Sequence, residues 1–387
     1  MNNYEYLIHL LYCAVHDTVP LEKPEGVSFE GVLALGKAHE VANLAFLSLD
    51  KLQNKPEPSV YQEWQLSYFF AVQRDARQQL AYEQVTQALH EKGIRTLEAQ
   101  GTVTKTLYPS PELRMMSDID FIVDEENFSA VEELMQGLGY TTWLVQPGEL
   151  NAEAEDIEIE FHAEFFSKDI YGQREQYYDA VNHPFSHAAP SAEKPLKWVL
   201  EDTYFYLYSL LHTIKHFEVM GCGIRRILDL FYLKKAYVET ADTALIERVL
   251  QEHGFTKSFR VLTVLEEKWF ENTPPRIDIT EAEEDVIRSG NHGTREIFLR
   301  NNVREDMQKG VRFAKFRHIW AFIFPSKQYI YAMYPVCAER GYSLITARLY
   351  RIFKKLTGGL KLSHTKEHIK TILRSDRHIT EKGETKE

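Results

Sequence analysis

The chain has 387 residues, of which 44% are hydrophobic and 12% aromatic, and this composition excludes a wholly disordered protein. Its formal net charge of −12 argues against binding nucleic acid over the whole surface. The cysteines Cys13, Cys222 and Cys337 lie far apart, without the spacing of a metal site or a disulfide framework. We find neither a signal-peptide pattern nor an apolar run of the ~18 residues that cross a membrane, so we expect a cytoplasmic protein.

Residues 1–80 are predicted to form an N-terminal helical region. Apolar residues recur there at helical spacing in three stretches, 4–15, 32–38 and 61–80. Residues 27–30 are predicted to be a loop, and residues 52–59, which contain two prolines, are predicted to be a linker. We therefore expect this region to end close to residue 80, before the first strand pattern begins.

Residues 81–194 alternate between helical and strand patterns. The predicted helices are 81–91, 102–107 and 127–138, and the predicted strands are 94–99, 117–123, 140–145 and 156–165. Glycines follow two of these helices at the position of a C-terminal cap. This order of elements indicates one α/β layer.

The rest of the chain is predicted to be helical. Residues 195–308 form a helical domain, with helical patterns at 195–241, 243–270 and 280–300 and a break at two adjacent prolines. Residues 309–387 form a basic C-terminal segment, with amphipathic helical stretches at 312–322 and 343–356.

The charge of the C-terminal segment is opposite to that of the remaining chain. Between Lys309 and Arg377 there are fifteen Lys or Arg residues and three acidic residues, a balance of +12, so the remainder carries −24. Such a segment suits a phosphate-rich substrate, an anionic membrane surface or an acidic partner. It equally suits docking against the acidic body of the same protein.

Asp118 and Asp120 stand at alternate positions of the apolar stretch 117–123. Side chains of a strand alternate between its two faces, so the two carboxylates are expected on one face. Neighbouring carboxylates repel each other unless a cation lies between them. Hard cations such as Mg²⁺ bind such pairs together with substrate phosphates, and this arrangement serves phosphoryl or nucleotidyl transfer.

The later stretch 157–162 alternates in the same way. Glu158, Glu160 and His162 share one face, and the apolar residues between them take the other. If this strand neighbours the first one, a third carboxylate joins the aspartate pair. The alternative is that both are half-exposed strands, each with a solvated acidic face.

In this order and spacing, the residues resemble the bacterial uncharacterised nucleotidyltransferase family of the polymerase-β-like nucleotidyltransferase superfamily. The resemblance spans roughly residues 80–355. It is carried by Leu107-Tyr108-Pro109, Pro111, Leu113-Arg114-Met115, Ser117-Asp118-Ile119-Asp120, Glu160-Phe161-His162, Lys215-His216, Ile224-Arg225-Arg226, Leu228-Asp229, Ile323-Phe324-Pro325-Ser326, Tyr331 and Tyr334-Pro335. Its most specific part is Arg114 followed by Asp118-Ile119-Asp120. The resemblance implies an α+β protein: a nucleotidyltransferase core of a mixed sheet with helices, flanked by N-terminal and C-terminal helical regions.

The resemblance also implies roles for the carboxylates. Asp118, Asp120 and Glu160 would be the catalytic residues and the ligands of one or two Mg²⁺ (or Mn²⁺) ions, and Glu160 would also accept the proton of an attacking hydroxyl. Glu158 is the competing choice on the same face. His162 either orients the acceptor or a carboxylate, or is satisfied by local hydrogen bonds.

Six further residues are implied to contact the nucleotide: Gly101, Thr102, Arg114, Ser117, Lys215 and Arg225. A glycine before a helix lets the backbone approach phosphate, and the planar guanidinium of Arg114 suits a phosphate. Each has an alternative. The glycine also fits an ordinary strand–helix turn, and Arg114 also fits an ion pair with Glu112 or another acid. Arg225 also fits an ion pair with Asp229, four residues further along a helix.

The predicted function is Mg²⁺-dependent transfer of a nucleoside monophosphate from NTP to a hydroxyl or phosphate of an unknown acceptor, with the resemblance pointing to surface-polysaccharide metabolism. The family usually has Lys-Gly where this chain has Gln100-Gly101, and glutamine offers only an amide to a phosphate. The alternative is therefore a degenerate member that binds a nucleotide or a partner protein without turnover. The sequence gives no strong indication that the protein binds nucleic acid.

Overall fold

A computed structural model describes residues 1–98, 100–146, 148–166, 180–308, 310–327, 330–331, 334, 336–337, 340–357, 371–373 and 375. It divides into two compact units, Met1–Phe217 with Cys222–His292, and Glu218–Gly221 with Gly293–Glu387. The predicted division at residues 80, 194 and 308 stays a prediction. Pro335 and most of the basic segment beyond residue 357 lie outside the described residues.

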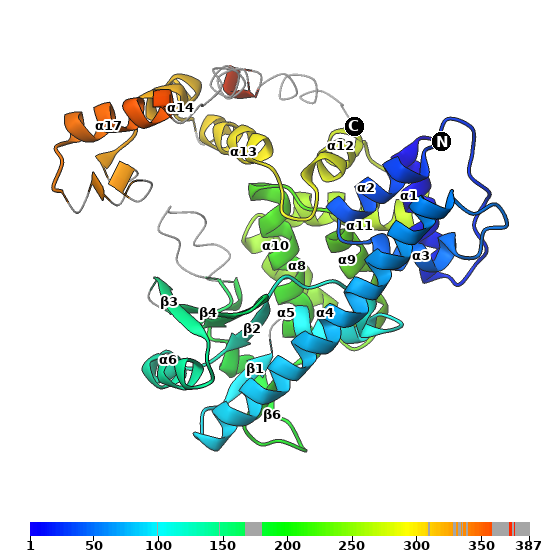
Figure 1. Ribbon diagram of the computed structural model, residues 1–387, viewed down its shortest axis with the longest axis horizontal. Coiled ribbons are helices and arrows are strands. Elements are labelled where there is room, and N and C mark those ends of the chain that lie inside the picture. The colour runs from blue at the N-terminus through cyan, green and yellow to red at the C-terminus, as the bar shows by residue number, and fades with distance from the viewer. Residues whose placement is uncertain are drawn as a thin grey trace. The chain divides into compact units, whose positions relative to one another are not determined.

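The N-terminal region is helical, as expected. Its helices are α1 (Asn3–Val15), α2 (Phe29–Ala38), α3 (Ala42–Leu49) and α4 (Pro58–Glu91). The predicted loop at 27–30 is wrong in its second half, because the Ser28 side chain accepts a hydrogen bond from the Gly31 N–H and so caps a helix that begins at Phe29. The two helices predicted at 61–80 and 81–91 form one helix, since neither glycine nor proline interrupts them. Figure 1 shows α4 running from the N-terminal helices to the sheet.

The first unit contains one mixed sheet. Its strands are β1 (Thr96–Glu98), β2 (Ile119–Ile122), β3 (Thr141–Gln146), β4 (Glu149–Ala154), β5 (Ile157–His162), β6 (Ala188–Pro190) and β7 (Lys197–Leu200). Their order across the sheet is β3-β4-β5-β2-β1-β7-β6. The pairs β2–β5 and β1–β7 are parallel and the other neighbours are antiparallel, so the expected mixed sheet is confirmed.

Three strands were not predicted. The segment of β4 contains two alanines, an asparagine and two glutamates, a composition with low strand propensity, and it becomes a strand through pairing with both β3 and β5. The helix predicted from residue 195 is wrong at its start, because residues 197–200 pair as β7 with β1 and the helix begins at Asp202. Ala99, the last residue of the first predicted strand, lies outside the described residues.

The sheet buries one apolar face. Four side chains on this face are at most 1% exposed: Ile119, Phe121, Ile159 and Phe161. The Phe121 ring stacks on Tyr82 of α4 at 5.3 Å and on Phe161 at 5.6 Å between ring centroids. Helix α6 (Phe128–Gly137) packs into the same apolar cluster. Because strand side chains alternate, Asp120 and Glu160 lie on the opposite face.

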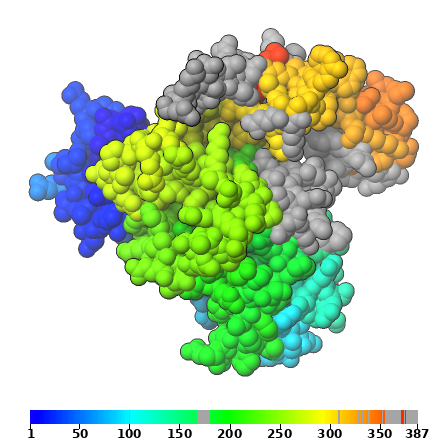
Figure 2. Space-filling model, turned by 180° about the vertical axis from the view of Figure 1, so that it is seen from behind, coloured from blue at the N-terminus to red at the C-terminus, as the bar shows by residue number. Residues whose placement is uncertain are grey.

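A group of helices follows the sheet in the first unit. Their bounds are α8 (Asp202–Val219), α9 (Ile224–Tyr237), α10 (Thr243–Glu252), α11 (Thr256–Phe270) and α12 (Thr280–Ser289). The hydroxyl of Tyr4 in α1 donates to Glu283 of α12 at 2.5 Å, and Figure 2 shows the blue N-terminal residues beside the yellow-green residues of these helices. The helix predicted at 280–300 is interrupted, because Gly290 has a positive φ and ends α12.

Short helical segments complete the first unit. Helix α5 (Gln100–Thr104) runs into a 3₁₀ turn at Lys105–Leu107, and further 3₁₀ turns cover Pro111–Leu113, Glu125–Asn127 and Pro184–His187. The predicted helix 102–107 is thus a short α-helix followed by a 3₁₀ turn.

The second unit is helical. It contains α13 (Arg295–Gln308), α14 (Ala314–Ile323) and α17 (Leu344–Thr357), and the last two agree with the predicted helices at 312–322 and 343–356. In the part of the chain that the structure describes, no helix combines the length and the apolar character that a membrane crossing requires.

Candidate active site

The two acidic strands are neighbours in the sheet. Strands β2 and β5 pair in parallel, with Asp120 directly opposite Glu160 and Ile122 opposite His162. The side chains of Asp120, Glu160 and His162 are 27%, 22% and 21% exposed, so they are shielded but accessible. The expected meeting of carboxylates from separate segments is therefore confirmed for this pair.

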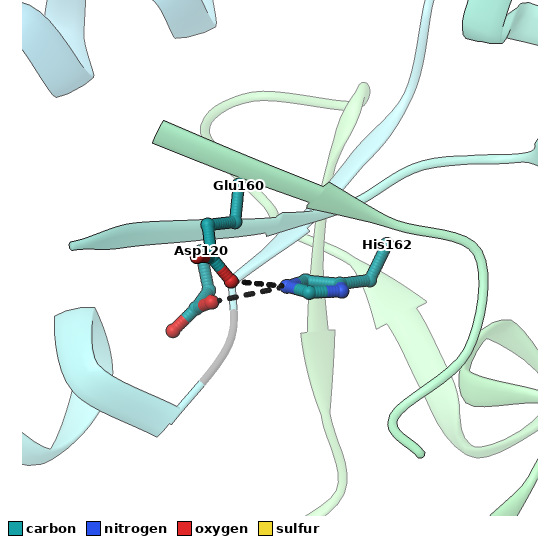
Figure 3. A group of neighbouring side chains, drawn as sticks. All are labelled: Asp120, Glu160 and His162. Carbon is teal, nitrogen blue, oxygen red and sulfur yellow. Dashed lines mark hydrogen bonds and ion pairs between the residues drawn. The ribbon is translucent and has the colours of Figure 1, made fainter. Parts of the chain in front are cut away.

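His162 joins the two carboxylates. Its Nε2 lies 3.2 Å from Asp120 Oδ1 and 3.3 Å from Glu160 Oε2, and Figure 3 shows the ring directed at both. Burial lowers the pKa of His162, but its hydrogen bonds to Asp120 and Glu160 outweigh burial and raise the pKa to about 10. An imidazolium here takes the position in which a metal cation would neutralise the same two carboxylates. The sequence left the role of His162 open, and the structure favours orientation of the carboxylates.

Asp118 adds negative charge beside this pair. Burial, followed by the fields of Asp120 and Glu160, raises the pKa of Asp118 to about 7, while Arg225 opposes the shift. Asp120, Glu160 and His162 form a group whose ligand atoms all lie within 4.8 Å of one another, and Asp118 is not part of that group. The three predicted metal ligands are therefore brought together as a close pair with a third carboxylate nearby.

Asn151 is a site residue that the sequence did not reveal. It lies opposite Glu160 in the β4–β5 register, and its Nδ2 donates to Glu160 Oε1 at 3.1 Å and to Glu158 Oε1 at 3.3 Å. This amide links the two candidate glutamates and restricts the rotamer of Glu160. Recognising Asn151 required β4, which was not predicted.

The donor set fits a hard divalent cation. The oxygens of Asp118, Asp120 and Glu160 are the ligand type that Mg²⁺ prefers, and the repulsion that raises the pKa of Asp118 is the repulsion a cation would relieve. His162 could join these ligands only after losing a ring proton, because an imidazolium has no lone pair for a metal ion.

Arg114 is occupied by an ion pair in this structure. Its Nε and Nη2 donate to Asp229 Oδ1 and Oδ2 at 2.8 and 2.9 Å, and the two side chains are 4% and 1% exposed. The Tyr108 hydroxyl donates to the same carboxylate at 2.7 Å. The geometry favours the alternative for Arg114, an ion pair with an acid, and Arg114 ties the segment before β2 to α9.

Arg225 and Lys215 also make protein contacts. An Nη1 of Arg225 lies 2.7 Å from Glu40 Oε2 and donates to the carbonyl of Met115, so its partner is Glu40 and not the predicted Asp229. The ammonium of Lys215 lies 5.5 Å from the centre of the Phe166 ring.

The glycine of α5 permits a close approach of two segments. A Cβ on Gly101 would meet Met116 Sδ at 3.3 Å, so glycine allows α5 to lie against the residues before β2. Thr102 and Gln100 are buried, and among the described residues Thr102 Oγ1 and Gln100 Nε2 have no hydrogen-bond partner.

Arg74 of α4 holds the segment before the aspartates. Its Nε donates to the Met116 carbonyl at 2.8 Å, and its Nη2 donates to the Ser117 carbonyl at 2.7 Å. Sequence reasoning missed this positioning residue, because a surface-type arginine in a long helix carries no local signal for such a contact.

Comparison with known proteins assigns the chain to a family. The model of the uncharacterised nucleotidyltransferase family matches residues 25–271, which is more than half of the chain. The chain belongs to this nucleotidyltransferase family. The matched region includes the sheet, the carboxylate strands and helices α8 to α11.

The other two comparisons add little. No curated protein matches the chain. Among solved structures, the solution structure of the antibiotic-resistance factor ANT(2'')-Ia is similar, with 12% identity and a TM-score of 0.34 over 51% of this chain and 100% of that chain.

Proposed function

We propose that this nucleotidyltransferase is an active, Mg²⁺-dependent enzyme that moves a nucleoside monophosphate from NTP to a hydroxyl or phosphate of an acceptor. The observation that supports this most directly is the register of β2 and β5, which sets Asp120 opposite Glu160 on the polar face of the sheet. Asp118 and His162 complete the charged cluster. Family membership supports nucleotidyl transfer in general.

In the proposed reaction the acceptor oxygen forms a bond to the α-phosphorus, and the bond from that phosphorus to the bridging oxygen of the β-phosphate breaks. The electron pair leaves with pyrophosphate. Glu160 accepts the acceptor proton, Asn151 orients Glu160, and His162 holds Asp120 and Glu160 together. Asp118, Asp120 and Glu160 are the residues that would hold Mg²⁺, which supplies neutralisation of the phosphate oxygens.

The other residues predicted to contact the nucleotide remain proposals, and their contacts in the structure support them to different degrees. Gly101, Thr102 and Ser117 belong to the segments next to Asp118. We propose that they contact the nucleotide through their main-chain groups. Lys215 fits contact from α8. Arg114 and Arg225 would have to leave their carboxylate partners to reach a phosphate, so we assign them to positioning of the site.

The experiment that tests this function is label transfer from the four α-labelled NTPs, with Mg²⁺ or Mn²⁺, to cell-extract and surface-polysaccharide fractions. The expected result is thermal stabilisation of the protein by at least one NTP with a divalent cation, together with cation-dependent transfer of label. Stabilisation without transfer in any fraction would instead support the degenerate member that Gln100 suggests. If no NTP stabilised the protein and no label were transferred, both the active enzyme and the degenerate member would be contradicted.

A second role, attachment to a membrane, is favoured by a different observation. On α17, Ile345, Leu349 and Phe353 are each more than half exposed and stand four residues apart on one helix face. On α14, Phe316 and Trp320 are likewise more than half exposed at the same spacing. Exposed aromatic faces within a strongly basic segment are typical of helices that lie on anionic lipid, and we propose that this segment docks on the cytoplasmic surface of a membrane.

Vesicle sedimentation tests this attachment with the full chain. We expect sedimentation with phosphatidylglycerol vesicles, little with phosphatidylcholine vesicles, and at least about a tenfold loss of binding when Trp320 and Phe353 are both replaced by serine. Leu80→Ser, at another exposed apolar position, is the control and should bind like the wild type. Equal sedimentation of the double variant and the wild type would exclude attachment through these faces.

A further inference from the structure

Two adjacent arginines of α9 have different environments. Arg225 forms an ion pair with Glu40 at 2.7 Å. Arg226 forms no ion pair with any carboxylate among the described residues, and its Nε is buried without a hydrogen-bond partner. Burial, followed by the field of Arg225, lowers the pKa of Arg226 to about 10, and the opposing fields of Asp229 and Cys222 do not cancel this shift.

The side chain that Arg226 contacts directly is a histidine, and Asp229 acts on it only through its field. Its Nη1 lies 3.2 Å from His212 Nδ1, and the His212 ring meets the His216 ring edge-on at 4.7 Å between centroids. His212 and His216 are one turn apart on α8, as the helical repeat requires. Burial, helped by the charges of Arg226 and Lys215, holds the pKa of both histidines well below the usual value.

The contact to Arg226 determines the tautomer of His212. A guanidinium can only donate, so His212 Nδ1 accepts the hydrogen bond and the ring proton is on Nε2. His212, His216 and Arg226 are all partly exposed, so a ligand from solvent can reach them. The three side chains therefore present hydrogen-bond donors, with one full positive charge, at an accessible position.

Aromatic rings connect this cluster with the end of β5, because the His212 ring lies 6.4 Å from the ring of Phe166, four residues after His162. Tyr208 lies one turn before His212 on α8, stacks on Phe165 at 4.1 Å, and lies within the electrostatic reach of Asp118, Asp120 and Arg226. A shielded cation that serves only the fold is normally paired, as Arg114 is with Asp229. An unpaired one beside a carboxylate centre fits an anion that arrives with the substrate.

We propose that Arg226, with His212 and His216, binds the phosphate chain of the nucleotide at the β- and γ-phosphates. The choice of a nucleotide as the ligand rests on the proposed function. The proposal assigns the phosphate contact to Arg226, a residue that sequence reasoning did not choose; that reasoning named Arg114, Lys215 and Arg225. The same residues would hold pyrophosphate after the bond to the α-phosphorus breaks.

Calorimetry with inorganic pyrophosphate in EDTA tests the phosphate contact by itself, because neither a metal ion nor turnover is involved. We expect the wild type to bind pyrophosphate, and Arg226→Met to weaken binding by about 10- to 100-fold, the value of a charge-assisted hydrogen bond. Arg226→Lys, which keeps the charge, should fall between them. The control is Arg248→Met, which removes the same charge from an exposed position of α10 and should bind like the wild type.

Three results would overturn the proposed phosphate contact: no pyrophosphate binding by the wild type, unchanged affinity in Arg226→Met, or an equal loss in Arg248→Met. Thermal unfolding without added anion gives an independent readout. Removing an uncompensated charge should raise the melting temperature of Arg226→Met, whereas a purely structural arginine would lower it and leave affinity unchanged. Displacement of pyrophosphate by ATP supports the nucleotide as occupant; failure of ATP to displace it contradicts that choice. If the protein bound pyrophosphate but transferred no label, the proposed function would be contradicted and the phosphate contact of Arg226 would still stand.

Discussion

Asp120→Asn is expected to reduce Mg²⁺-dependent nucleotidyl transfer by at least about a thousandfold. The substitution keeps the shape of the side chain but removes a negative charge from the centre of the group formed with Glu160 and His162. A neutral amide holds a divalent cation weakly, and the loss of an oriented electrostatic contact at a reacting phosphate lowers rates by about 10² to 10³ by itself. Label transfer and the Mn²⁺ affinity measured by electron paramagnetic resonance should fall together.

The same variant should remain folded. Neutralising Asp120 removes its repulsion with Asp118 and weakens its contact with His162, which keeps Glu160 as a charged partner, so the two effects oppose each other. Asp156→Asn is the control, because Asp156 lies just before β5 but pairs with Arg77 at an exposed position. It should keep full activity. An Asp120→Asn enzyme as active as this control would show that the reaction takes place elsewhere.

Arg114→Met is expected to lower the free energy of unfolding by about 3–5 kcal/mol, the usual effect of breaking a buried ion pair on one side. The substitution leaves the carboxylate of Asp229 charged and fully buried, and the Tyr108 hydroxyl still donates to it. Urea denaturation followed by circular dichroism measures the change.

Two matched variants separate the ion pair from other effects. Combining Arg114→Met with Asp229→Leu should recover most of the lost stability, because no charge is then left buried. Arg288→Met breaks the exposed pair with Glu284 on α12 and should change stability by less than about 1 kcal/mol. If Arg114→Met left stability unchanged but abolished nucleotide binding, Arg114 would be the phosphate ligand that the family resemblance implies, and its pairing with Asp229 would be secondary.

The carboxylate centre was predictable because its signal is local. Alternation alone puts Asp118 with Asp120, and Glu158 with Glu160 and His162, on single strand faces. Their apolar counterparts, such as Phe121 and Phe161, must be buried, and this requirement brings the two strands into one sheet with their acidic faces on the same side. Pairing and register then follow from the need to bury one face.

The partners of the arginines were not predictable, because they come from distant segments. Asp229 lies 115 residues from Arg114, and Glu40 precedes Arg225 by most of the first unit. Both choices depend on how α9 packs against the core, and a helix pattern does not specify that. Strand β4 was missed because its pairing with β3 and β5 outweighs weak local propensity, and β7 was missed because its short apolar run directly precedes helix α8.

The uninterrupted helix α4 also has a mechanical consequence. At 34 residues it is about 50 Å long, and a rigid rod of that length turns a tilt of about 5° into a displacement of about 4 Å at its far end. Arg74, near the middle of α4, donates hydrogen bonds to the carbonyls of Met116 and Ser117, immediately before Asp118. A ligand that moves α4 together with the N-terminal helices is therefore expected to shift these carbonyls and the aspartates that follow them, whereas a tilt about Arg74 would leave them in place.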